Sequence, residues 1–145
     1  MGNSTSTDNQ LSFEDIQILN QKHDTTMINT LHPTEQGCLI RGTIRLEGEE
    51  KVINDLLQSD TRRLIIVYGK NCNDDSVARR HAQLVSLGFQ RVFIYRGGMF
   101  EWLCLQDIYG NDEFPTTSRE IDLLKYKPIS MFGGGGGGGR RIMDG

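Results

Sequence analysis

The sequence predicts an α/β protein with a mostly parallel, doubly wound sheet flanked by helices, folded as a single domain. Segments with helical periodicity alternate with short apolar, β-branched runs, and the links between them are short. This alternation is typical of parallel strands joined by helical crossovers. The 145 residues are enough for one domain with a sizeable core.

Three elements are predicted in the first third of the chain. A helix begins after Ser12, a candidate N-cap, because apolar residues recur at helical spacing over residues 13–19. A short strand follows over residues 27–31 and is interrupted by Pro33. Residues 40–44 form a second brief extended segment.

The middle of the chain supplies the strand that we expect at the centre of the sheet. An apolar stripe predicts a helix over residues 49–58. Leu64–Tyr68 is a continuous apolar run, which is typical of a strand covered on both faces. The next helix begins at Asp75 or Ser76 and ends before Gly88, which stands where a helix-ending glycine is expected.

The last predicted strand covers residues 92–95 and ends at Gly97-Gly98. Apolar residues then predict a helix from Phe100 through about Ile108. Residues 107–117 contain a helix end and a long turn, which forms either a lid beside the loop that follows Leu64–Tyr68 or a packed C-terminal extension.

Both ends of the chain are predicted to be flexible and to flank a domain over residues 11–130. Residues 1–10 are polar, and residues 131–145 contain seven consecutive glycines, residues 133–139. The first six residues match the pattern for N-myristoylation of Gly2. One acyl chain without a basic cluster predicts only weak, peripheral membrane contact.

Composition and charge exclude several classes of function. The net charge of -3 leaves no broad basic field for nucleic acid. The chain has neither a secretory signal nor an apolar run that approaches the roughly 20 residues needed to span a bilayer. Cys38, Cys72 and Cys104 are odd in number and irregularly spaced, which argues against a disulfide framework and for a reducing, cytoplasmic setting. Without a Cys-x-x-Cys pair or clustered histidines we expect no metal, and no organic cofactor is implied.

The residues that carry chemistry are predicted in the loop after Leu64–Tyr68. Ligands of an open parallel sheet bind beyond the carboxyl ends of the strands. The N–H groups and the dipole at the start of the following helix stabilise an anion there and make a thiol more nucleophilic. Cys72 is the candidate catalytic nucleophile, with an ordinary loop cysteine as the alternative. The candidate anion- and substrate-binding residues are Gly69, Lys70, Asn71, Asn73, Asp74, Asp75, Ser76 and Arg79.

The segment from Leu87 to Trp102 resembles the rhodanese family. It carries the family's helix-ending Gly-Phe at Gly88, then a strand, then a Gly-Gly-x-x-x-Trp signature that starts at Gly97. A weaker match runs over residues 27–44, and the resemblance covers about residues 12–109. It implies a rhodanese-like fold, with Phe89 and Trp102 in the core and Gly97-Gly98 beneath the active-site loop.

The sequence departs from the family pattern at several positions. Asn29 and Leu31 stand where the family has Asp and Arg. The family's cysteine follows its strand at once, and Gly69 occupies that place here, so Cys72 lies three residues further on in a longer loop. Arg79 does not have the family's cysteine-to-arginine spacing either, and a solvated helix face is its alternative role.

The resemblance implies three functions, which the sequence leaves open. In the first, Cys72 is the nucleophile of a sulfurtransferase or persulfide carrier that takes sulfur from a small donor and passes it to a thiol. In the second, the domain is a catalytically inactive module that binds a protein partner through the loop face. The third is a phosphatase-like or arsenate-reductase-like reaction. Cys38 and Cys104 are predicted to be small buried hydrophobes, although a Cys38 close to Cys72 would form a redox switch.

Overall fold

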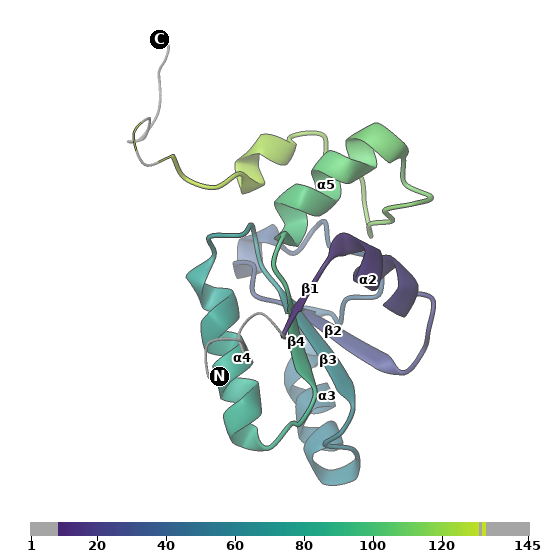
Figure 1. Ribbon diagram of the computed structural model, residues 1–145, viewed down its shortest axis with the longest axis vertical. Helices are drawn as coiled ribbons and strands as arrows, with labels where there is room; N and C mark the ends of the chain where they lie inside the picture. Colours follow the sequence, from purple (N-terminus) through teal and green to yellow (C-terminus); the bar gives the residue numbers. More distant parts are fainter. Residues whose placement is uncertain (1–8, 131, 133–145) are drawn as a thin grey trace.

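A four-stranded parallel sheet forms the centre of the computed structural model, which describes residues 9–130 and 132 (Figure 1). In spatial order its strands are β1 (Gln10–Leu11), β4 (Val92–Tyr95), β3 (Leu64–Tyr68) and β2 (Thr25–Asn29). All three pairings are parallel. The predicted fold class is therefore confirmed.

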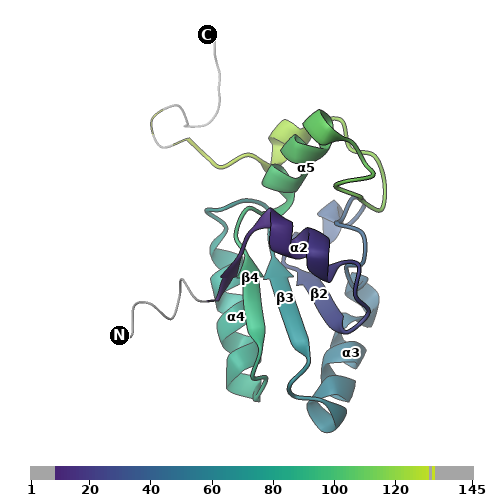
Figure 2. The same ribbon diagram turned by 45° about the vertical axis from the view of Figure 1, so that its right-hand side comes forward.

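Helices cover both faces of this sheet (Figure 2). Helices α3 (Leu46–Ser59) and α4 (Asp75–Leu87) pack on one face, where Ile53 and Leu84 join Val67 in one buried cluster. Helices α2 (Phe13–Leu19) and α5 (Gly98–Tyr109) enclose the other cluster, in which Ile16 and Trp102 are buried. Two short 3-10 helices complete the fold, η1 (Pro33–Glu35) and η2 (Leu123–Tyr126).

The bounds of β3, α4 and β4 agree with the predicted elements because their signals are local. The side chain of Asp74 caps α4 at its start, and Gly88 ends it with a φ of 118°. Such a positive φ is easily reached only without a Cβ atom. β2 instead ends at Asn29, two residues before the predicted strand end, because the Asn29 side chain accepts the Leu31 N–H at 2.9 Å and turns the chain.

The N-terminal boundary also differs from the prediction. Gln10 was assigned to the flexible segment, but it pairs with Ile94 in β1. A strand of two residues is too short to show an alternation of apolar and polar side chains, so the sequence does not reveal it. Main-chain hydrogen bonds hold it, such as the 2.7 Å bond from the Ile94 N–H to the Asn9 carbonyl. The predicted acylation site Gly2 and the glycine tract lie outside the described residues. Among the helices of the described part, none is long and apolar enough to cross a membrane.

The segment 107–117 forms the packed extension rather than the lid. Phe114 is buried, and Thr116 forms an antiparallel bridge with Ile40. The indole N–H of Trp102, a fully buried side chain, donates to the Pro115 carbonyl at 3.1 Å. This segment therefore closes the core over the end of the sheet.

Candidate functional site

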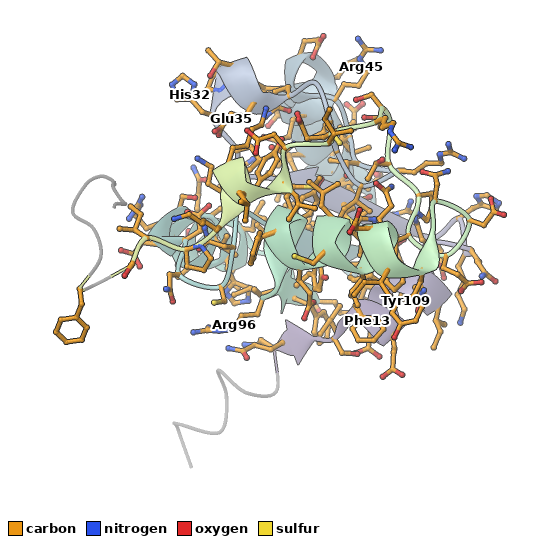
Figure 3. All side chains as sticks on the ribbon, turned by 90° about the horizontal axis from the view of Figure 1, so that it is seen from above. Phe13, His32, Glu35, Arg45, Arg96 and Tyr109 are labelled. Carbon is orange, nitrogen blue, oxygen red and sulfur yellow. The ribbon has the colours of Figure 1, made fainter. Side chains whose placement is uncertain are left out.

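The loop between β3 and α4, residues 69–74, lies at the carboxyl end of the sheet, as predicted. Figure 3 looks onto this end of the molecule, with His32 and Glu35 on one side and Arg96 on the other. Since β2, β3 and β4 are parallel, the residues that follow each of them gather at this edge. The loop therefore lies between Thr30, which follows β2, and Gly97-Gly98, which follow β4.

The start of α5 is hydrogen-bonded to the loop. The N–H groups of Met99 and Phe100 donate to the carbonyls of Gly69 and Lys70, both at 2.9 Å. Gly98 has a φ of 67°, and a Cβ there would lie 2.6 Å from the Gly69 carbonyl oxygen. Only glycine permits both this backbone conformation and this close approach. Gly98 therefore packs directly against the loop, as the resemblance to the rhodanese family implied.

The interior of the loop is filled by the carboxylate of Asp74. Its Oδ2 accepts the Lys70 N–H at 2.9 Å, and its Oδ1 accepts the Ser76 N–H at 3.0 Å and the Ser76 hydroxyl at 2.6 Å. The N–H group of Ser76, in the first turn of α4, and the N–H group of Lys70, in the loop, therefore both bind a carboxylate. That anion is a side chain of the protein itself.

The position directly after β3 has no room for a side chain. A Cβ on Gly69 would lie 2.4 Å from Asp74 Oδ2, 2.5 Å from Val77 Cγ2 and 2.7 Å from Thr30 Oγ1. Gly69 itself is buried. The family's cysteine position is thus occupied in space by the loop's own carboxylate and its neighbours.

Cys72 lies on the outer side of this loop. It is exposed, and its thiol donates a long bond of 3.8 Å to Asn73 Oδ1. The Asn73 N–H, one of the donors expected around the sulfur, instead binds Asn71 Oδ1 at 2.9 Å. A recess of about 390 Å³ beside the thiol includes Arg96, which sequence reasoning missed. The sequence signal that could have identified Arg96 is a basic residue directly after a predicted strand, here β4.

A neighbouring cleft of about 630 Å³ shares Asn71, Asn73, Asp74 and Asp75 with this recess. The predicted residues that line it are Lys70, Asn71, Asn73, Asp74, Asp75, Ser76 and Arg79. Its opposite wall comes from the C-terminal arm, which we define as residues 119–130, through Leu124, Lys125, Lys127 and Ile129. The arm was not predicted as part of the site, because its contact with the loop depends on the tertiary fold.

An ion pair between two residues that line this cleft joins the loop to η1. Lys70 Nζ lies 2.9 Å from Glu35 Oε2. Burial alone would raise the pKa of Glu35, but the hydrogen bonds from Lys70 and from the His32 backbone N–H outweigh it and hold this pKa below its ordinary value. The positive charge of Lys70, which was predicted to favour a bound anion, is therefore paired with the Glu35 carboxylate.

The other two cysteines, Cys38 and Cys104, are both less exposed than Cys72. Cys38 is buried, as predicted, and its thiol donates to the Ser118 carbonyl at 3.3 Å. Cys104 is only partly buried, which differs from the predicted burial. Burial raises the pKa of both thiols. All three cysteines are free, and the described residues contain no cluster of three or more metal-ligating side chains.

Comparisons with known proteins agree with this architecture. Solved structures with the same fold include the rhodanese-like domain of an Anabaena protein, at 21% identity and a TM-score of 0.55, covering 84% of this chain and 86% of that one. A Bacillus halodurans protein matches at 18% identity and a TM-score of 0.58, over 72% and 76% of the two chains. A yeast protein described as a tyrosine phosphatase of the rhodanese family matches at 18% identity and a TM-score of 0.55, over 79% and 96%. No significant match was found among curated proteins.

The strongest assignment comes from the sequence itself. Residues 15–104, more than half of the chain, match the family described as the rhodanese-like domain. The match contains β2, β3, β4 and the loop with Gly69 and Cys72, and it ends within α5. The chain therefore belongs to the rhodanese-like domain family.

Proposed function

We propose that this chain is a rhodanese-like module without sulfurtransferase activity, which binds a protein partner through the face formed by its loop and C-terminal arm. The observation that carries the proposal is the Asp74 carboxylate inside the loop. It takes the N–H groups of Lys70 and Ser76, which an anionic sulfur would need as donors. It also fills the space next to Gly69.

The surroundings of Cys72 support the same proposal. Its thiol lies outside the loop interior, and its hydrogen-bond partner is a neutral amide oxygen of Asn73. A persulfide held at Cys72 is an anion, and it would lie beside the acidic pair Asp74 and Asp75, which line the same recess. The like charges disfavour that anion.

One observation favours a second candidate function, a persulfide carrier. Arg96 lines the recess beside the exposed Cys72 thiol, and a guanidinium is a good partner for an anionic sulfur. In that reaction the Cys72 thiolate would attack the outer sulfur of thiosulfate, form an S–S bond and release sulfite. A phosphatase-like or arsenate-reductase-like reaction needs the interior N–H donors for its oxyanion, so Asp74 weighs against it.

Mass spectrometry of the intact protein after thiosulfate treatment separates the two candidates. We expect no added sulfur, either in the wild type or in Cys72→Ser. An active sulfurtransferase treated in parallel shows that the conditions load a competent cysteine. A gain of one sulfur atom that disappears in Cys72→Ser would overturn the proposal in favour of the persulfide carrier.

A further inference from the structure

Three loops gather at the end of the sheet opposite the candidate site, and we call the surface that they form the basic end. Residues 20–24 lead into β2, residues 60–63 into β3 and residues 88–91 into β4. Since these strands are parallel, their amino ends lie at one edge of the sheet, away from the loop of the candidate site (Figure 2). The fold therefore builds the basic end from segments that are far apart in the sequence.

Hydrogen bonds join the three loops. A guanidinium N–H of Arg63 donates to the His23 carbonyl at 3.4 Å and to the Thr25 carbonyl at 3.1 Å. The Gln90 N–H donates to the Thr61 carbonyl at 3.0 Å. The acceptors of Arg63 are neutral carbonyl and hydroxyl oxygens, so its positive charge is not cancelled by an acid.

The basic end has an excess of positive charge. Its loops contain two acids, Asp24 and Asp60, and four basic residues, Lys22, Arg62, Arg63 and Arg91. Within the described part of the chain, none of these six residues forms an ion pair. The basic end thus carries +2, while the whole chain carries -3 and the rest of it therefore -5. Lys22, Arg62 and Arg91 are exposed, so most of this positive charge meets the solvent.

Two exposed apolar side chains border the basic end. Val85 and Leu87, in the last turn of α4, are 49% and 46% exposed. α4 ends at Leu87 and leads directly into residues 88–91. Basic residues next to exposed apolar residues are typical of a surface that lies on an anionic membrane.

The N-terminal segment enters the fold near the same surface. β1 is parallel to β4, and the Asn9 carbonyl, just before β1, accepts the Ile94 N–H. Asn9 therefore lies beside a residue that is three positions along the chain from Arg91. Gly2 is seven residues before Asn9, a span of at most about 25 Å. An acyl chain on Gly2 can thus reach a membrane that the basic end contacts.

We infer that the basic end docks on the surface of a membrane that contains anionic lipids. Lys22, Arg62 and Arg91 would lie against the lipid headgroups, and Val85 and Leu87 would enter the headgroup region. A single acyl chain binds a membrane only weakly, and a basic surface is a second signal that makes anchoring stable. In this orientation the candidate site points away from the membrane. The inference concerns a different surface and does not rest on the proposed function.

A membrane fits the basic end better than a nucleic acid does. An excess of two charges is small for a polyanion, and the negative charge on the rest of the chain would repel one that extends along the protein. A flat membrane touches one end only, and exposed charges more than about 8 Å away are largely screened at physiological salt. A membrane also accounts for the exposed apolar side chains.

Co-sedimentation of the full, unacylated chain with phosphatidylserine vesicles at low ionic strength tests this inference, with phosphatidylcholine vesicles as the neutral reference. We expect binding to phosphatidylserine only, and added salt should weaken it. Arg62→Glu/Arg91→Glu should lower the partition coefficient at least tenfold, because each basic residue near an anionic surface contributes about fivefold. Arg63 is kept, because its hydrogen bonds join two of the loops.

Arg96→Glu/Arg119→Glu is the matched control. It changes the net charge by the same amount at two exposed residues of the opposite end, one directly after β4 and one at the start of the C-terminal arm. The partition coefficient of this variant should stay within twofold of the wild-type value. Circular dichroism confirms that each variant is folded.

Protein acylated on Gly2, as confirmed by its mass, provides a second measurement. It should bind vesicles with about 30 mol% phosphatidylserine more tightly than vesicles of phosphatidylcholine alone. This difference should disappear in the acylated Arg62→Glu/Arg91→Glu variant, which keeps the acyl chain and loses the basic surface.

The outcomes separate this inference from its alternatives. No preference of the wild type for phosphatidylserine, or an equal loss of binding in the two double variants, would overturn it. Binding to a DNA duplex without binding to vesicles, lost in Arg62→Glu/Arg91→Glu, would assign the basic end to nucleic acid instead. The mass of Cys72 after thiosulfate treatment tests the proposed function independently of all these results.

Discussion

Replacing Asp74 with alanine tests directly whether its carboxylate closes the loop. Loss of a side-chain N-cap costs about 1–2 kcal/mol. The part-buried Lys70 N–H also loses its acceptor, which costs about 1–3 kcal/mol. Both losses come from removing the same carboxylate, so they are not fully additive. We expect a combined loss of about 2–4 kcal/mol in the free energy of unfolding.

Asp75→Ala is the matched control for this variant. Asp75 is an exposed acid in the first turn of α4, so its removal should cost only about 0.3–1 kcal/mol through the helix dipole. Urea unfolding with an unchanged m-value measures both losses. If Asp74→Ala destabilises the protein no more than Asp75→Ala does, the carboxylate does not hold the loop.

The emptied loop of Asp74→Ala should also accept an oxyanion. Sulfate stabilises most proteins through exclusion from their surface, so the informative quantity is the extra stabilisation of Asp74→Ala over the wild type and Asp75→Ala. A specific site adds about 2.7 kcal/mol at a concentration one hundred times its Kd. Equal stabilisation of all three proteins by sulfate, against chloride at the same ionic strength, would refute an anion site inside the loop.

Three other changes have expected outcomes. Gly98→Ala should lower the free energy of unfolding by about 1–3 kcal/mol in urea, because alanine disfavours a φ of 67° and its Cβ would meet the Gly69 carbonyl; an unchanged midpoint would contradict this. Burial raises the pKa of Glu49 despite the nearby Arg80, so the stability that Glu49 contributes is full below its ordinary pKa and is lost as pH rises through the raised pKa. The stability of the wild type relative to Glu49→Gln should therefore fall as the pH rises above the ordinary glutamate pKa of 4.5, and a constant difference would rule this out. Gly2→Ala should reduce the membrane-bound fraction of protein made in a eukaryotic cell, and unchanged partitioning would count against acylation.

Local signals explain why much of the fold could be predicted from the sequence. The continuous apolar run of β3 and the glycine after α4 each depend on residues that are neighbours in the chain. β1 could not be predicted in this way, because its two residues are held by backbone pairing with β4. The start of α3 was also missed by three residues, since Leu46 is exposed and Arg45 provides no side-chain cap.

The candidate site shows the same division between local and distant contacts. Asp74 could be predicted as a capping residue because the capping bond spans two residues. Its bond to the Lys70 N–H depends on the path of the whole loop, so the sequence did not reveal that the carboxylate fills the interior. Tyr126 meets Asn71 across 55 positions of sequence, a distance at which pattern reasoning gives no signal.

The hydrophobic core includes residues that lie beyond the end of the family match, in the C-terminal arm and just before it. A fragment that stops at residue 104 would lack Phe114 and Tyr126, whose side chains are 3% and 1% exposed. It would also lose the strand-like bridge between Ile40 and Thr116 and the acceptor of the Asn71 side chain. Trimming the protein at the family boundary would therefore cut through its hydrophobic core, and we expect a stable fragment to extend at least to Tyr126.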